Sequence, residues 1–218
     1  MIPGLEDAKT QDFLLIRSRS QPFRNPREFV TLVRAATKPA LLLPKLAFGL
    51  GVGRTLQVLP QLVRSLREPM TPLAETSYDS ALPVQWGAAA ARYALFAERP
   101  GGGAVGDDLG EQLAATLADG PVRWTMAAQF FVDEAQTPIE DASQDWDEAV
   151  APHLPLATLS LETVPTADQQ AAIETWSFDP WHAPVEFRPL GAMMRARNAA
   201  YRLSTIERQA VDERTLVD

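Results

Sequence analysis

An arginine and a tyrosine stand four residues apart near the end of the chain, in Arg197-Asn198-Ala199-Ala200-Tyr201. The run from about Ala192 to Arg208 contains no Pro or Gly after Gly191, which predicts a helix, and residues i and i+4 share one helix face. A tyrosine binds ferric iron of haem as the phenolate, although a free tyrosine has a pKa of about 10. A guanidinium one turn away favours the phenolate and fixes its direction. The spacing alone equally fits an amphipathic helix with a half-buried tyrosine.

Composition excludes several other kinds of site. The chain has no cysteine and only two histidines, His153 and His182. Thiolate zinc sites, iron–sulfur clusters and cysteine nucleophiles are therefore excluded, and a multi-histidine metal site is nearly so. A formal charge of −8 disfavours nucleic acid as a partner, because neutralising phosphates requires clustered Lys and Arg.

No membrane-targeting segment is expected. Residues 1–7 lack the basic and apolar regions of a signal peptide. The most apolar stretch, from Pro39 to Leu59, is interrupted by Pro44, Lys45 and Arg54, whereas a spanning helix needs about 20 nearly uncharged residues. We expect no transmembrane segment. The absence of cysteine does not fix the compartment, but it fits a reducing cytoplasm, and we expect a cytoplasmic protein.

The coarse pattern predicts an α+β fold. Helices are expected from Asn25, a candidate N-cap, to Ala36 and from Asp108 to Ala118. Four segments are expected to be strands: Asp12 to Arg17, Val84 to Phe96, Val122 to Val132 and Leu156 to Glu162. Alanine propensity would make the second a helix. Long strands separated by helical excursions predict an antiparallel barrel or a strongly curved sheet.

Residues 37–71 form a helical insertion punctuated by Pro and Gly. Leu56, Leu59, Val63 and Leu66 give it an amphipathic stripe, with Arg54, Arg64 and Arg67 beside it. The stripe fits either a solvated helical excursion or a basic amphipathic patch that contacts a membrane or an apolar substrate. Pro60, expected to break the stripe, favours the solvated excursion.

Several separated motifs occur in one order along the chain. Near the C-terminus stand Phe178-Asp179-Pro180-Trp181-His182, Phe187-Arg188-Pro189-Leu190-Gly191, Arg195-Ala196-Arg197 and Tyr201. Upstream stand Thr10 to Ile16, then Tyr78-x-Ser80-x-x-Pro83-x-x-x-Gly87, then Gln129-Phe130, Thr137 to Ala142 and Trp146. Together, from about Ile2 to Arg208, these motifs resemble those of the catalase-related haem proteins.

The resemblance implies a site and a fold. Tyr201 would be the iron ligand of haem b, Arg197 its hydrogen-bonding partner, and Arg195 a residue that helps to hold a haem propionate. The fold would be a single catalase-like domain over residues 1–218. It would consist of a partial haem-enclosing antiparallel β-barrel over 1–165 with the helical insertion, and a C-terminal connection and haem-ligand helix over 166–218. The implied activity is that of a haem oxidoreductase on hydrogen peroxide or organic hydroperoxides, fatty-acid hydroperoxides among them.

The sequence departs from that family at the distal side of the haem. Family members carry a distal histidine in a long N-terminal portion, and here Met1 falls after the matching point. The asparagine that usually follows the first strand is replaced by Arg17-Ser18-Arg19-Ser20. His182 is expected to make a structural hydrogen bond and His153 to lie in a loop, because lone histidines are more often structural than catalytic.

Other interpretations stay open. The chain could be a non-enzymic remnant that binds haem weakly or folds only against a partner, either a second copy or a complementing N-terminal chain. An unclosed barrel has exposed sheet edges, which favours such pairing. The acidic region from Asp133 to Glu148 indicates a solvated surface more than a cation site. Gly101-Gly102-Gly103 with Gly106 lacks the features of a phosphate loop.

Overall fold

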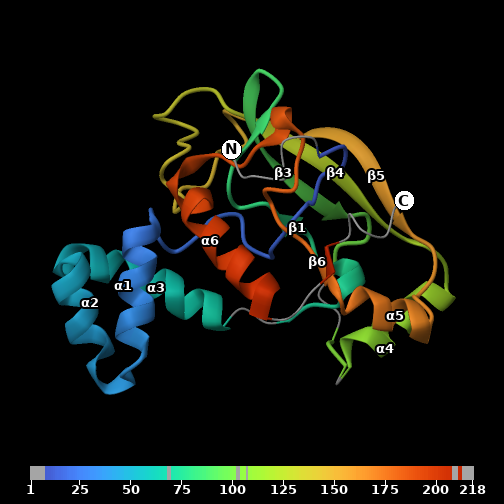
Figure 1. Ribbon diagram of the computed structural model, residues 1–218, viewed down its shortest axis with the longest axis horizontal. Coiled ribbons are helices and arrows are strands. Elements are labelled where there is room, and N and C mark those ends of the chain that lie inside the picture. The colour runs from blue at the N-terminus through green and yellow to red at the C-terminus, as the bar shows by residue number, and fades with distance from the viewer. Residues whose placement is uncertain (1–7, 68–69, 102–103, 107, 208–210, 213–218) are drawn as a thin grey trace.

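A computed structural model describes residues 8–67, 70–101, 104–106, 108–207 and 211–212. An antiparallel sheet forms the body, α6 lies across the side that faces the viewer in Figure 1, and α1, α2 and α3 form a separate lobe at the left. The helices are α1 (Pro26–Ala36), α2 (Leu42–Leu50), α3 (Val52–Arg67), α4 (Leu109–Ala118), α5 (Ala167–Ile173) and α6 (Gly191–Glu207). Short 3-10 turns lie at Pro39–Leu41, Leu73–Glu75 and Val185–Phe187.

The strands confirm the predicted fold class. They are β1 (Tyr78–Asp79), β2 (Val84–Trp86), β3 (Ala89–Ala97), β4 (Val122–Phe130) and β5 (Leu154–Leu161), with a small parallel pair of β6 (Trp176–Ser177) and β7 (Val211–Asp212). The main sheet has the order β1-β3-β4-β5, and β2 pairs with β3. Within the described residues, β1 and β5 are not paired with each other, so the barrel is partial.

The alanine-rich segment is extended, as predicted, but it is two strands rather than one. β2 and β3 form a hairpin that turns at Gly87, whose φ of +61° suits glycine. β3 then pairs with β4 from Ala91 to Ala97. Ala91 and Ala94 are almost fully buried in the middle of the sheet. Sheet pairing and burial therefore override the helix propensity of alanine here.

The predicted strand from Asp12 to Arg17 is wrong for most of its length. Only Ile16 forms a bridge, exchanging two hydrogen bonds of 2.8 and 2.7 Å with Asp79. β1 is two residues long, so it offers no backbone partner to residues 13–15. The apolar run of this segment reflects side-chain packing along the edge of the body rather than a sheet ladder.

The insertion is helical, as predicted, but Pro60 does not interrupt it. α3 runs unbroken from Val52 to Arg67 with Pro60 inside. Proline removes one backbone donor and so frees the carbonyl of Leu56. Both Pro60 and Leu56 are exposed, and solvent can satisfy that carbonyl at small cost. The expectation that the proline breaks the amphipathic stripe is therefore wrong.

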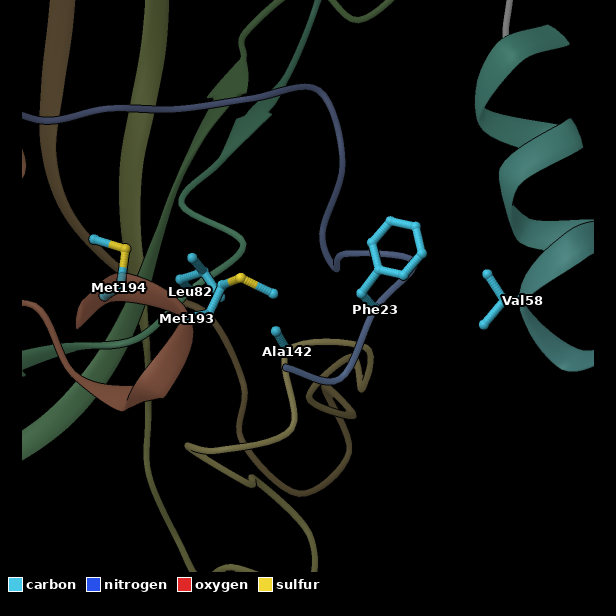
Figure 2. Close-up of a cluster of buried hydrophobic side chains, with 6 residues drawn as sticks. All are labelled: Phe23, Val58, Leu82, Ala142, Met193 and Met194. Carbon is cyan, nitrogen blue, oxygen red and sulfur yellow. The ribbon is translucent and has the colours of Figure 1, made fainter. Parts of the chain in front are cut away.

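One apolar cluster joins the lobe to the rest of the chain. It consists of Phe23, Val58, Leu82, Ala142, Met193 and Met194, drawn in Figure 2. Val58 comes from α3 and the two methionines from the first turn of α6, so the cluster ties the insertion to the helix that carries Tyr201. A second cluster, which includes Leu117, Val122 and Trp124, packs α4 against the sheet.

The helix predicted from Asn25 is confirmed with its cap. The side chain of Asn25 accepts a hydrogen bond from the Glu28 backbone N–H at 3.1 Å. Glu28 in turn binds Arg54 of α3 at 2.9 Å. Burial raises the pKa of Glu28, but the hydrogen bond and charge of Arg54 outweigh it, so the net pKa shift is downward. This ion pair locks α1 and α3 together.

The partly buried carboxyl group of Asp79 in β1 makes the stability of the fold depend on pH. Burial raises its pKa from 3.8 to about 6, with Arg19 and Arg92 opposing and Asp145 reinforcing the shift. A raised carboxyl pKa means that the folded chain holds its proton more tightly, so stability falls as pH rises through about 4 to 6. We expect Asp79→Asn to flatten this dependence and to stabilise the fold at pH 7 by about 1–2 kcal/mol after solvent screening.

Chemical denaturation between pH 4 and 8 measures this effect. Glu174→Gln, at an exposed position, is the matched control and should leave the pH profile unchanged. A destabilised Asp79→Asn variant at pH 7 would show that the ionised carboxylate is needed by the fold.

Candidate functional site

The backbone at the start of α6 fixes the direction of that helix. Gly191 has φ of +83°, and a Cβ there would lie 2.9 Å from the carbonyl oxygen of Ile139. The next N–H, that of Ala192, donates to the Glu140 carboxylate at 2.7 Å. A carboxylate at a helix N-terminus is favourable because it faces the positive end of the helix dipole. Residues 139–140 therefore anchor the end of α6 nearest the body.

The two residues at the predicted spacing meet. The Arg197 guanidinium donates a hydrogen bond to the phenolic oxygen of Tyr201 at 2.6 Å. Its central carbon lies 5.3 Å from the centre of the tyrosine ring, and a second guanidinium nitrogen is 3.9 Å from the sulfur of Met194. Both side chains are half-buried. The guanidinium thus approaches the oxygen that the sequence marks as a ligand atom.

Arg197 and Tyr201 line an open cavity of about 450 Å³. Its other lining residues come from the segment before the lobe, from the loop after β1 and from the C-terminal connection: Phe13, Leu14, Leu15, Ile16, Ser80 and Phe178. Apart from Ser80 these six are apolar, so the phenol and guanidinium face hydrocarbon walls. The resemblance motifs around residues 10–16, 78–87 and 178–182 therefore converge in space.

Tyr93 of β3 lies beside this cavity, and sequence reasoning missed it. Its ring packs edge-on against Phe13 at 5.1 Å, and its hydroxyl donates to the Leu14 carbonyl at 3.4 Å. Burial raises the pKa of Tyr93 to about 12, so this phenol stays protonated. The available signal was a lone large polar aromatic within the alanine run of β3.

Arg195 is not brought to the cavity. Its guanidinium binds Glu140 at 3.1 Å and its side chain is 60% exposed. Residues i and i+2 lie on different faces of a helix, which separates Arg195 from Arg197. The role proposed for Arg195 at a propionate stays a prediction.

Neither histidine lines the cavity. His182 is buried, with Nδ1 3.2 Å from Asp12 and Nε2 3.1 Å from the Thr10 hydroxyl, which agrees with the expected structural hydrogen bond. His153 lies in a loop, as expected, with its ring edge-on to Phe96 at 4.8 Å. Burial lowers the pKa of His153, and Glu148 opposes the shift.

The arginines that replace the family's asparagine region also lie elsewhere. Arg17 and Arg19 line a different cavity, of about 380 Å³, together with Arg64 and Asp145. Arg19 forms an ion pair with Glu148 at 2.8 Å. In the described ranges, no group of three or more histidines and carboxylates is arranged to hold a metal ion.

No protein-family model and no curated protein matches the sequence. Solved structures do match. A fungal catalase superposes with a TM-score of 0.72 at 13% identity over 91% of this chain and 45% of that one. A bacterial catalase gives 0.66 at 16% over 89% and 43%, and catalase A from Saccharomyces cerevisiae gives 0.70 at 12% over 89% and 45%.

The fold is catalase-like. This confirms the family resemblance that the sequence motifs predicted, at the level of the fold. The chain spans less than half the length of each of these three catalases.

Gly191 tests how the site is positioned. Gly191→Ala places a Cβ in a left-handed conformation and against the Ile139 carbonyl, so we expect a loss of at least about 1–2 kcal/mol in the free energy of unfolding. Gly53→Ala in α3 is the control, because nothing lies within 4 Å of its added Cβ. The control should be neutral or stabilising. Equal stability of the two variants in urea would contradict the close approach at Gly191.

Proposed function

We propose that this chain binds haem b in the cavity between α6 and residues 13–16 and acts as a haem oxidoreductase on hydrogen peroxide or an organic hydroperoxide. Tyr201 supplies the iron ligand and Arg197 directs its oxygen. The 2.6 Å contact between these two side chains, at the wall of an apolar cavity in a catalase-like fold, is the observation that carries the proposal.

The residues of the cavity suit haem. A cavity of about 450 Å³ lies within the range of roughly 300–1,000 Å³ that small-molecule and cofactor sites occupy. Five apolar side chains match a flat apolar macrocycle, and one phenolic oxygen matches ferric iron. Tyr93 is the other tyrosine near the cavity. Its phenol stays protonated and donates a hydrogen bond to the Leu14 carbonyl, so it does not compete as a ligand.

Each polar residue then has a stated task. Arg197 stabilises the phenolate form of Tyr201 and holds the ring in one orientation. Arg195, which lies outside the cavity and binds Glu140, would have to release Glu140 to reach a propionate. Bound haem supplies the redox chemistry, and a tyrosinate ligand donates electron density that favours cleavage of the O–O bond.

Among the described residues that line the cavity, none is a histidine or a carboxylate that could transfer a proton. Heterolysis of a peroxide requires a base to move a proton between the two oxygens, and such a group contributes about 10²–10⁴-fold to the rate. The two histidines are held by contacts outside the cavity, and arginines stay protonated. This favours, as the second candidate, haem binding with little turnover, in which the chain acts as a non-enzymic haem protein or works with a partner.

Haem binding is tested by titrating the purified chain with hemin. We expect the absorption spectrum of a ferric phenolate complex, and we expect Tyr201→Phe to abolish it because phenylalanine has no ligand oxygen. Arg197→Gln should weaken it. Tyr78→Phe is the matched control, since the Tyr78 hydroxyl bonds the Leu73 carbonyl and lines no part of the cavity. An unchanged spectrum in Tyr201→Phe would remove Tyr201 as the ligand.

Turnover distinguishes the two candidate functions. We expect the haem-loaded 218-residue chain to consume hydrogen peroxide about 10²–10⁴-fold more slowly than a catalase, because none of the described residues that line the cavity is a base that could move the proton. Fusing a segment that bears a distal histidine ahead of Met1 should raise the rate. Free hemin at equal concentration is the control. A fast unextended chain whose rate is lost in His182→Gln would identify His182 as the acid–base group.

A further inference from the structure

The helical lobe differs in charge from the rest of the chain. Residues 26–67 hold seven basic side chains and one carboxylate, that of Glu28, in a chain with 20 basic and 28 acidic side chains. Glu28 is already bound to Arg54 of the same lobe at 2.9 Å. The other six basic side chains therefore give the lobe a clear positive charge, while the rest of the chain holds 13 basic and 27 acidic side chains.

The lobe also exposes large apolar side chains along α3. Val52 and Leu56 are each 65% exposed and Val63 is 37% exposed. Their spacing of four and seven residues places them in one stripe, because α-helical positions i, i+4 and i+11 fall on the same face. The buried Thr55 and Val58 lie beyond one border of the stripe, so the side of α3 that packs inward is not the side that carries the stripe.

A corner between two helices lies at the start of this stripe. α2 ends at Leu50 and α3 begins at Val52, with Gly51 at a φ of +84° between them. Phe48, near that corner, is 97% exposed and so makes almost no contact with the protein. Exposing a phenylalanine ring to water is unfavourable, and transfer of the ring to an apolar phase would lower the free energy.

Basic residues flank one border of the stripe. On a helical wheel Arg67 lies next to Leu56 and Arg64 lies one step further round, while Val58 lies beyond the other border of the stripe. Arg64 is exposed, although it also lines the cavity that holds Arg17 and Arg19. An exposed apolar stripe with arginines along its border is the arrangement of helices that lie in the plane of a bilayer interface. In Figure 1 the lobe stands clear of the sheet at one side.

We propose that the α1–α3 lobe docks on an anionic lipid bilayer, with Phe48, Val52 and Leu56 entering the headgroup region and Arg64 and Arg67 at the lipid phosphates. The acidic remainder of the chain is repelled by the same surface, which orients the molecule with the lobe toward the bilayer. None of the helices that the structure describes has both the length and the apolar character needed to cross a bilayer, so docking is interfacial. This proposal does not rest on haem binding.

Flotation with vesicles tests the docking. The full chain is mixed with vesicles of phosphatidylcholine containing 30% phosphatidylglycerol, or of phosphatidylcholine alone, at low and high salt. We expect binding to the anionic vesicles, weakened by salt. The combined variant Phe48→Ser, Val52→Ser and Leu56→Ser should bind at least tenfold more weakly. Arg64→Gln with Arg67→Gln should lose roughly 25-fold, since each arginine near an anionic surface contributes roughly fivefold.

A matched control removes three exposed valines outside the lobe, Val132→Ser, Val164→Ser and Val185→Ser, and should bind like the original chain. Circular dichroism and melting curves establish that each variant is folded. Absence of binding to anionic vesicles overturns the proposal, as does equal binding by the serine variant of the lobe. A concentration-dependent dimer without vesicles that the lobe variant abolishes would also overturn it, because a second copy would then cover the stripe.

Discussion

The buried carboxylate of Asp12 holds together two parts of the chain that are far apart in sequence. One carboxylate oxygen lies 3.2 Å from His182, the other accepts from the Asp179 N–H at 2.8 Å, and the Asp12 N–H donates to the His182 carbonyl at 3.0 Å. These contacts fix the start of the segment whose next four residues form a wall of the cavity. Without them the segment would be held by the Ile16 bridge to β1 and by the contacts of Phe13 and Leu14 with Tyr93, and its start would lose its tie to residues 179–182.

Much of the fold was predictable because the local sequence pattern favours the same secondary structure as the tertiary packing. The 191–207 helix has a glycine that only its start requires, and the helix at residue 26 has its own cap. The predicted end of the former at Arg208, and Gly102 and Gly103, lie outside the described residues. Prediction failed where tertiary context decided. Gly87 splits one extended run into a hairpin, and Pro60 is tolerated because it lies on the solvent face of α3.

The candidate site shows the same division. Four-residue spacing on one helix predicts the contact of Arg197 with Tyr201, because the helix geometry alone brings them together. The residues that line the cavity come from segments far apart in the sequence, and the spacing of residues within one segment does not predict how separate segments pack. Phe178 was noted only as part of a motif, and Tyr93 was not noted, yet both lie at the cavity. Arg195 shares the helix and the motif, but its neighbour is Glu140.

Charge and chemistry are segregated along this chain. The phenol–guanidinium pair sits among apolar side chains on one side of α6, and the histidines serve contacts that tie segments together. The cluster containing Val58 and Met193 links α3 to the first turn of α6, so the basic lobe is anchored to the same helix that carries the candidate ligand. The apolar cluster holds α3 in place against α6 and carries no charge itself. The lobe can therefore bind an anionic surface without a charged contact to the cavity, because salt screens charges over distances of about 10 Å. The two proposed functions therefore share a mechanical support and depend on different side chains.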